Sequence, residues 1–222
     1  MTGTRRGRPR TPLLSRESIV AATLQVIDAE GVAGVGMRSV ARALGVDAKS
    51  LYNHVDGKDG LLDAVAEQLL GGLVLPEPTG DARHDLHAIA TAFRSRALAH
   101  PGAAPLVLTR QLSSLEGLAP VDAVLAVLLA AGATPEQSVH LLRMLLATLI
   151  GTLLRELSAA PAFGGDDGER RRALETSGLP AVVRTAPHLA EFDRDAEFEH
   201  TVDLAITAVL DRIGQPSRPP GR

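Results

Sequence analysis

The chain has 222 residues, of which 45% are hydrophobic but only 2% aromatic, so its core packs more readily from helices than from sandwiched sheets. It contains no cysteine, which excludes thiol catalysis, disulfides and thiolate metal sites. The net charge of −3 is unevenly distributed: residues 1–60 carry nine Lys or Arg and six Asp or Glu, whereas the remainder carries fourteen Lys or Arg and twenty Asp or Glu. Only the N-terminal part therefore suits a polyanionic partner.

Residues 1–14 form a basic arm in which Gly and Pro separate four arginines, with no acidic residue among them: Arg5, Arg6, Arg8 and Arg10. Because such a segment lacks the apolar groups of a core, we expect a flexible arm. An extended arginine-rich segment fits a narrow minor groove of DNA and adds salt-sensitive affinity. The alternative is an ordinary solubilising tail, and both interpretations stay open.

The first predicted helix begins after Ser15, a suitable N-cap, and ends at Gly31. Its apolar residues follow the helical period: Val20, Leu24 and Ile27. A short helix with Val40 and Leu44 on its apolar side follows and ends at Gly45.

Asp47 is the predicted N-cap of a second short helix, whose inner face carries Leu51 and Val55 four residues apart. The two short helices and the turn at Gly45 predict a helix-turn-helix. The next helix runs into Pro76-Glu77-Pro78, which indicates a hinge or domain boundary, and its apolar residues are Leu61, Leu62, Val65 and Leu69.

The stretch from Met37 to Val55 contains Ser50-Leu51-Tyr52-Asn53-His54-Val55 and is followed by Lys58-Asp59-Gly60-Leu61-Leu62. In length, spacing and flanking helices it resembles the helix-turn-helix of TetR-family transcriptional repressors. The resemblance implies that the second helix of the motif enters the major groove of double-stranded DNA.

Burial of Leu51 and Val55 would leave short polar side chains on the outer surface, where they reach base edges. Tyr52 and Lys58 suit phosphate contacts. The predicted DNA-binding residues are Arg38, Ala48, Lys49, Ser50, Tyr52, Asn53, His54 and Lys58. The alternative is a surface helix whose polar face is merely solvated.

The sequence departs from the family pattern in two places. Gly36 stands where Ser or Thr usually caps the first helix of the motif, which weakens that cap. Ala48 and Lys49 replace the Gln-Pro pair of the tetracycline repressor, so that repressor's operator is not expected here.

Beyond the boundary, periodicity predicts helices over residues 86–97, 106–110 and 120–131. Thr134-Pro135-Glu136-Gln137 supplies an N-cap, a proline at the first helical position and a capping-box glutamine for the longest helix, which extends to about Leu157. Residues 158–168 are predicted to be a flexible loop and residues 195–213 a final helix, with one apolar face made by Phe198, Val202, Ile206 and Val209.

The helix from Thr134 is apolar almost all round, so it must be enclosed by a core or a subunit interface. Its longest uncharged stretch, residues 144–154, is shorter than the roughly 18 residues of a membrane span. The N-terminus also lacks the apolar run of a signal peptide. We therefore expect no membrane contact and a cytoplasmic protein of a bacterium, associated with the nucleoid when bound to DNA.

The resemblance extends, more faintly, to the C-terminal domain of the tetracycline repressor, through Phe93 to His100, Thr109-Arg110, residues 132–151 and residues 180–184. It implies a homodimer built on the long helix from Thr134 and the last helix, and a pocket for an unidentified small-molecule effector. Carried over by position, the pocket residues are Ile89, Phe93, Val107, Arg110, Val121, Val124, Leu125, Val139, Leu142 and Leu146. Each of these taken singly also fits an ordinary core position.

The polar positions that hold a metal-chelated tetracycline are not kept. The ring-binding asparagine falls on Ile89, the pocket glutamine on Val124, and the metal-coordinating histidine on or beside Val107. The acidic partner of the metal falls on Arg155, with Glu156 one residue out of phase. These changes predict an apolar ligand held by shape, without a metal or cofactor. Arg110 either contacts the ligand or pairs with a structural acid.

Two alternative functions can be weighed. An enzyme would need a catalytic or cofactor site, and three candidates fail. His84 and His87 have no third metal ligand at helical spacing, and the glycines of residues 31–36 are wrongly ordered for a dinucleotide-binding loop. Ser113-Ser114 lacks the pattern of a nucleophile elbow. A module that no longer binds DNA would not need Tyr52, His54 and Lys58. We therefore expect a regulator, not an enzyme.

The sequence thus predicts an all-α protein with an N-terminal three-helix DNA-binding domain and a C-terminal ligand-binding and dimerisation domain. The predicted boundaries are a flexible basic arm over residues 1–14, the DNA-binding domain over 15–75, the helical domain over 76–214, and a disordered tail over 215–222. The expected function is repression at a palindromic operator, relieved by an apolar small molecule.

Overall fold

The computed structural model describes residues 14–109, 118–157 and 166–214, and these residues contain helices and their connections without a strand. The described residues group into two compact units. One holds residues up to 68 together with 102–109, and the other holds 69–101 together with the described residues from 118 onward. The predicted all-α fold is confirmed.

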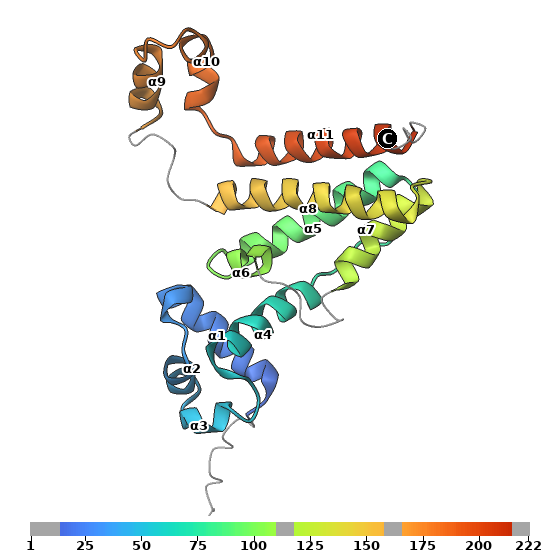
Figure 1. Ribbon diagram of the computed structural model, residues 1–222. Helices are drawn as coiled ribbons and strands as arrows, with labels where there is room; N and C mark the ends of the chain where they lie inside the picture. The colour runs from blue at the N-terminus through green and yellow to red at the C-terminus, as the bar shows by residue number, and fades with distance from the viewer. Residues whose placement is uncertain (1–13, 110–117, 158–165, 215–222) are drawn as a thin grey trace, which may run out of the picture. The chain divides into compact units, whose positions relative to one another are not determined.

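The first unit opens with α1 (Arg16–Glu30), η1 (Val32–Gly34) and α2 (Met37–Leu44), followed by α3 (Ala48–Leu51) and most of α4 (Gly57–Gly71) (Figure 1). Reciprocal hydrogen bonds start α1, because the Ser15 hydroxyl accepts from the Ser18 amide at 3.2 Å and the Ser18 hydroxyl from the Ser15 amide at 3.0 Å. The predicted cap at Ser15 is confirmed. The core of this unit includes Ile19, Ile27, Val40, Leu51, Leu61 and Val65, all fully buried.

The short helix α6 (Ala104–Thr109) groups with this unit, although the sequence placed residues 102–109 in the second domain. A close approach explains why the segment packs here. A Cβ atom at Gly102 would lie 3.1 Å from Ile27 Cγ2, so a larger residue there would require the Ile27 side chain to shift.

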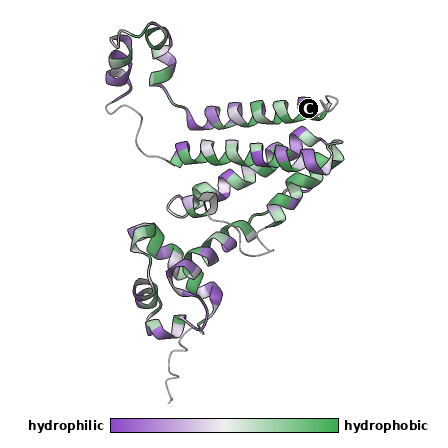
Figure 2. Cartoon of the chain, viewed as in Figure 1, coloured by the Kyte–Doolittle hydropathy of each residue, from purple (hydrophilic) through white to green (hydrophobic). Residues whose placement is uncertain are grey.

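The second unit contains α5 (Ala82–Ala99), α7 (Ala119–Ala130), α8 (Pro135–Leu157) and α11 (Arg194–Gly214) (Figure 1). In Figure 1, α8 and α11 lie side by side, and α7 packs against both α5 and α8. Their shared core is apolar, and α7 is green along most of its length in Figure 2. The buried members are Leu86, Leu128, Ala133, Leu141, Leu142, Phe198, Val202, Ile206 and Val209. The predicted apolar face of the last helix is confirmed.

The sequence missed a helical hairpin formed by α9 (Asp167–Glu175) and α10 (Pro180–Ala190). The predicted loop over residues 158–168 is wrong for its last residues, because α9 begins at Asp167. The Asp166 carboxylate caps this helix by accepting from the Glu169 amide at 2.8 Å. Residues 158–165 lie outside the described residues. Because α9 is mostly polar, as its purple colour in Figure 2 shows, no apolar period announces it.

Two details at the start of α8 and in the motif differ from expectation. Thr134 caps α8 by accepting from the Gln137 amide at 3.2 Å, but the Gln137 side chain donates to the Arg212 carbonyl at 3.1 Å instead of closing the capping box. Helix α3 ends at Leu51, so Val55 lies beyond it, although Val55 is buried as expected.

The sequence predicts that α8 is enclosed by a core or by a subunit interface, and the single chain by itself encloses only part of it. Val139, Met144 and Leu154 are each 37% exposed. By length and composition alone, α8 is long and apolar enough to cross a membrane, and 22% of its most apolar 18-residue stretch is buried. The core helix of a soluble protein meets the same criteria. Within the chain, α8 packs against α7 and α11.

Candidate DNA interface and ligand cavity

The turn of the helix-turn-helix is formed by a glycine in the left-handed region. Gly45 has φ 68° and ψ 31°. Its amide donates to the Arg42 carbonyl at 3.2 Å, and the Val46 amide donates to the Ala41 carbonyl at 3.0 Å. This pair of bonds is a Schellman motif, which satisfies the last carbonyls of α2 and turns the chain into α3.

The first turn of α2 compensates for the missing cap at Gly36. Gly36 is extended, with φ −168°, and its amide donates to the Ser39 hydroxyl at 2.9 Å. The same hydroxyl lies 2.9 Å from the Gly34 and Gly36 carbonyls, either of which accepts its proton. Ser39 therefore supplies the reciprocal half of a capping box whose other half glycine cannot provide.

Helix α3 is anchored from the inside and leaves its polar side chains outside. The Asp47 carboxylate accepts from the Lys49 amide at 2.7 Å, and Leu51 and Val55 are buried. The chain continues for one more turn, with the His54 amide donating to the Leu51 carbonyl at 2.9 Å.

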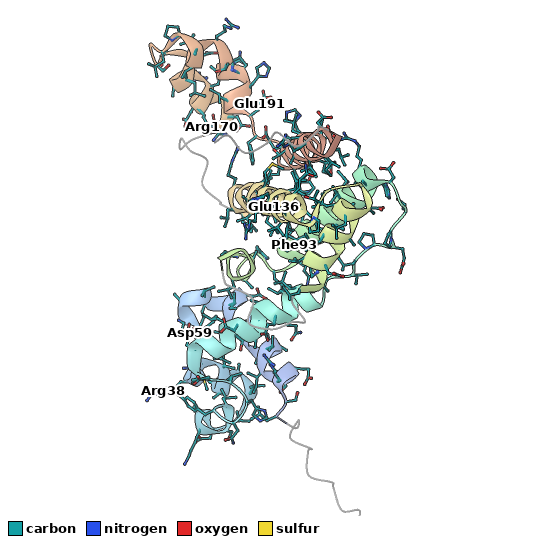
Figure 3. All side chains as sticks on the ribbon, turned by 45° about the vertical axis from the view of Figure 1, so that its right-hand side comes forward. Arg38, Asp59, Phe93, Glu136, Arg170 and Glu191 are labelled. Carbon is teal, nitrogen blue, oxygen red and sulfur yellow. The ribbon has the colours of Figure 1, made fainter. Side chains whose placement is uncertain are left out.

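The predicted DNA-binding side chains lie mostly at the surface. Tyr52 is 60% exposed. Arg38, which Figure 3 labels in this unit, is also exposed, as are Lys49, Asn53, His54 and Lys58, whereas Ala48 and Ser50 are half-buried. Lys58 donates through Nζ to the Ala33 carbonyl at 3.4 Å, a long bond that a phosphate can replace. The predicted minor-groove arginines Arg5, Arg6, Arg8 and Arg10 lie outside the described residues.

A separate cavity of about 60 Å³ lies within the second unit between α5, α7, α8 and α11. Apart from Thr148, its lining is aliphatic: Leu86, Ile89, Ala90, Val124, Leu142, Leu145, Leu146, Leu149, Val202, Ala205 and Ile206. The volume is below the roughly 300–1,000 Å³ of a drug-sized pocket. A ligand of that size must therefore move these helices apart to enter.

The structure brings four of the predicted pocket residues together in this cavity: Ile89, Val124, Leu142 and Leu146. Val121 and Leu125 pack instead against the core, Phe93 (labelled in Figure 3) is half-buried on α5, and Val139 is exposed. Arg110 and the side chain of Val107 lie outside the described residues.

The sequence missed the α11 wall of the cavity, which consists of Val202, Ala205 and Ile206. The sequence carries a signal for this wall, because Val202 and Ile206 belong to the predicted apolar face of the last helix. The positions carried over by resemblance came from α5, α6, α7 and α8, so that face was assigned to packing alone.

In the same unit, Arg94 and Glu156 form a largely buried ion pair between α5 and α8. Arg94 Nε lies 2.9 Å and 3.1 Å from the two Glu156 carboxylate oxygens, and an Arg94 terminal nitrogen lies 2.6 Å from one of them. Asp195 also contacts Arg94 at 2.5 Å, and the guanidinium lies 4.6 Å from the centre of the Phe198 ring. The Glu156 carboxylate raises the pKa of Arg94 above its ordinary value. Glu156 is thus engaged by an arginine and offers no free carboxylate to a metal.

No cluster of three or more metal-ligating side chains occurs among the described residues. His87 Nε2 lies 2.7 Å from a Glu199 carboxylate oxygen on α11, and His84 is exposed. The pair that could have begun a metal site is therefore divided between a helix contact and solvent.

Comparison with known proteins agrees with this arrangement. A family model for bacterial regulatory proteins of the tetR family matches residues 19–65, and a model for the tetracyclin repressor-like C-terminal domain matches residues 75–212. The HTH-type transcriptional repressor DrrR1 of Streptomyces coeruleorubidus is 30% identical over 96% of this chain and 82% of its own length. An HTH-type transcriptional regulator of Saccharopolyspora erythraea is 39% identical over 54% of this chain, and this match spans about half (52%) of that relative.

Among solved structures, the TetR family protein ActR of Streptomyces coelicolor in complex with actinorhodin superposes with a TM-score of 0.81 at 25% identity. The match covers 93% of this chain and all (100%) of ActR. The fold, the exposed α3 and the matched family models define a helix-turn-helix transcriptional regulator. The chain belongs to the TetR family, whose members bind operator DNA and small molecules and act as dimers.

Proposed function

We propose that this regulator is a repressor that dimerises, reads a palindromic operator with α3 and the following turn, and is released by an apolar small molecule. Neither an enzymatic activity nor a cofactor is part of the proposal. The observation that carries the DNA-binding part is the anchoring of α3 by Leu51 and Val55, which leaves Lys49, Asn53 and His54 on one exposed surface. The proposed domains are residues 15–75 for DNA binding and 76–214 for the ligand and the dimer.

In this proposal the module's contacts divide by chemistry. Lys49, Ser50, Asn53 and His54 face base edges, while Tyr52 and Lys58 contact phosphates. Arg38 and Ala48 complete the interface, and the arginines of the N-terminal arm enter the adjacent minor groove. The site of action is the bacterial cytoplasm, at the nucleoid when bound to DNA, without contact to a membrane.

The exposed apolar side chains of α8 and α11 support the proposed homodimer. Val139, Met144 and Leu154 on α8 and Leu204 on α11 are between 37% and 55% exposed. A soluble monomer rarely leaves such a surface open, and a short recognition helix needs a second copy for enough base contacts. The two half-sites should then lie about one helical turn of DNA apart.

The aliphatic cavity supports an apolar effector. Its wall offers one polar side chain, Thr148, and Ile89 and Val124 replace polar residues of the tetracycline repressor. Because Glu156 is paired with Arg94, a chelated Mg²⁺ would find no acidic ligand from this part of α8.

The DNA-binding proposal is tested by selecting preferred sequences from a random duplex pool with the wild type and three variants. Asn53→Ala and Lys49→Ala should change the preferred bases, at roughly 1–3 kcal/mol per good contact. Lys58→Ala should weaken all sequences alike and reduce the salt dependence by about one charge. Base preferences that shift in Lys58→Ala but not in Asn53→Ala would show that the docking of α3 is wrong. Arg143→Gln, in the other unit, is the matched control.

The effector proposal is tested by calorimetry of the full chain with tetracycline plus Mg²⁺ and with a panel of lipophilic natural products. We expect binding from the lipophilic panel only. Micromolar binding of tetracycline that depends on Mg²⁺ would refute the proposed ligand class, and so would a panel without any binder.

A further inference from the structure

Polar side chains join α5 to α11 at two successive turns of each helix. Arg83 lies 2.5 Å from an Asp203 carboxylate oxygen and donates to the Thr207 hydroxyl at 2.9 Å. One turn further along α5, His87 Nε2 lies 2.7 Å from a Glu199 carboxylate oxygen. We call these contacts the α5–α11 latch. The ion-pairing side chains are 37–63% exposed, so water can replace the contacts at low cost.

The latch lies beside the wall of the aliphatic cavity. Residues three or four apart on a helix are neighbours on one face. On α5, the cavity residues Leu86 and Ala90 each lie three positions after a latch residue, and on α11 Val202 and Ile206 do the same. The latch therefore follows the seam between α5 and α11 at one side of the cavity.

The other sides of the cavity are held by apolar packing or belong to the proposed dimer. Helix α7 packs against α5 and α8, and its Val124 and Leu125 lie against the shared core. Moving α7 away would expose this apolar surface to water. The outer surface of α8 and α11 carries Met144 and Leu204, which the proposed homodimer covers. Leu204 and the latch residue Asp203 are consecutive, so they lie on different faces of α11.

We infer that the α5–α11 latch is the gate through which the apolar effector enters and leaves the aliphatic cavity. The inference rests on the proposed function, since it takes this cavity as the effector site. At about 60 Å³ the cavity is too small for a drug-sized molecule, so helices must separate to admit one. Separating α5 from α11 breaks polar contacts that water replaces, whereas moving α7 exposes apolar surface. The latch therefore controls the rates of entry and release, while burial against the apolar wall sets the affinity.

A reversible cross-link across the latch tests this inference. The chain has no cysteine, so His87→Cys combined with Glu199→Cys supplies its only two thiols. The full-length variant is loaded with pyrenebutanol, a neutral apolar fluorophore, and is then treated with a short bis-methanethiosulfonate linker. Release of the probe into excess phosphatidylcholine vesicles should become about tenfold slower, and dithiothreitol, which cleaves the link, should restore the unlinked rate. Because the link forms after loading, the cavity is already expanded when the seam is closed.

The matched control links α8 to α11. The Gln137 side chain contacts the Arg212 carbonyl at 3.1 Å, so Gln137→Cys combined with Arg212→Cys places two thiols across these helices, away from the latch. This link should leave the release rate unchanged.

A variant without any link gives an independent measurement. Glu199→Ala removes one latch contact and should raise the association and release rates together by about two- to fivefold, so that Kd stays unchanged. A residue with only a structural role would change Kd instead. Glu175→Ala, which removes an exposed ion pair within α9, should behave as wild type.

The contrary outcomes are distinct. Unchanged release after the latch is linked, or equal slowing by the α8–α11 link, overturns the gate and leaves the apolar effector proposal standing. Rates in Glu199→Ala that equal those of wild type also overturn the gate, which keeps the test decisive if the double-cysteine variant fails to fold. Failure of pyrenebutanol to bind the wild type contradicts the aliphatic cavity as an effector site and overturns both proposals.

Discussion

Replacing Glu156 by glutamine should destabilise the helical domain strongly, because the Arg94–Glu156 pair joins α5 to α8 in a poorly solvated position. The Glu156 side chain is 4% exposed and that of Arg94 is 15% exposed. Glu156→Gln removes the charge that offsets the buried guanidinium while keeping the shape of the side chain. Loss of one partner of a buried ion pair costs about 3–5 kcal/mol. Since Arg94 keeps Asp195 and its stack on Phe198, we expect a smaller loss than that, about 2–3 kcal/mol.

The assay is thermal unfolding followed by far-ultraviolet circular dichroism, since the chain has no tryptophan to report by fluorescence. For a chain of this size the expected loss lowers Tm by about 5–10 °C. The protein concentration must be equal for all variants, because dimerisation adds to the apparent stability. Glu175→Gln is the matched control, as its partner Arg171 lies on the same helix and both side chains are 41–51% exposed. We expect no measurable change there.

A second variant keeps the argument testable if Glu156→Gln fails to fold. Arg94→Met combined with Glu156→Leu removes both charges and should recover most of the lost stability, since an apolar pair needs no partner. A Tm of Glu156→Gln within 1 °C of wild type, about the size of the control effect, would refute the reasoning, as would strictly additive effects in the double variant.

Three further predictions concern single side chains. Ser138 is 1% exposed and its hydroxyl has no hydrogen-bond partner among the described residues. Ser138→Ala should therefore raise the free energy of unfolding by about 1 kcal/mol in urea denaturation. A lower urea midpoint for the variant would contradict this. The Asp85 carboxylate accepts hydrogen bonds from the Thr79 hydroxyl, the Thr79 amide and the Gly80 amide at 2.6–3.1 Å, and these bonds lower its pKa. The stabilisation of the folded state by this carboxylate is therefore complete above about pH 4 and is lost as the pH falls through the lowered pKa. Asp85→Asn should flatten that acid limb of the denaturation midpoint, and an unchanged limb would refute the assignment. Gly45→Ala places a Cβ atom on a residue with φ 68° and should lower the free energy of unfolding by about 1 kcal/mol. Gly36→Ser, at φ −168°, should be neutral or stabilising. Equal melting curves for Gly45→Ala and wild type would show that the turn relaxes.

The elements that the sequence predicted well are those decided by neighbouring residues. The caps at Ser15, Asp47 and Thr134 and the stop at Gly45 depend on bonds that span two to five positions. Burial of Leu51 and Val55 follows from the same local period. Where the local signal was polar, as in α9, the helix went unnoticed, because its formation depends on packing against α10.

Tertiary structure decided everything that joins distant segments. The cavity exists where side chains of four helices fail to fill the space between them, which no period along one helix reveals, and this explains why the α11 wall was missed. By sequence Glu156 lies one residue from the position of a metal ligand, but in the fold it pairs with Arg94, 62 positions earlier. Arg155 came to lie over Phe192, 37 residues on, because α8 and α11 run side by side. Such pairings depend on how helices pack, and chain-local chemistry does not specify which distant face will meet which.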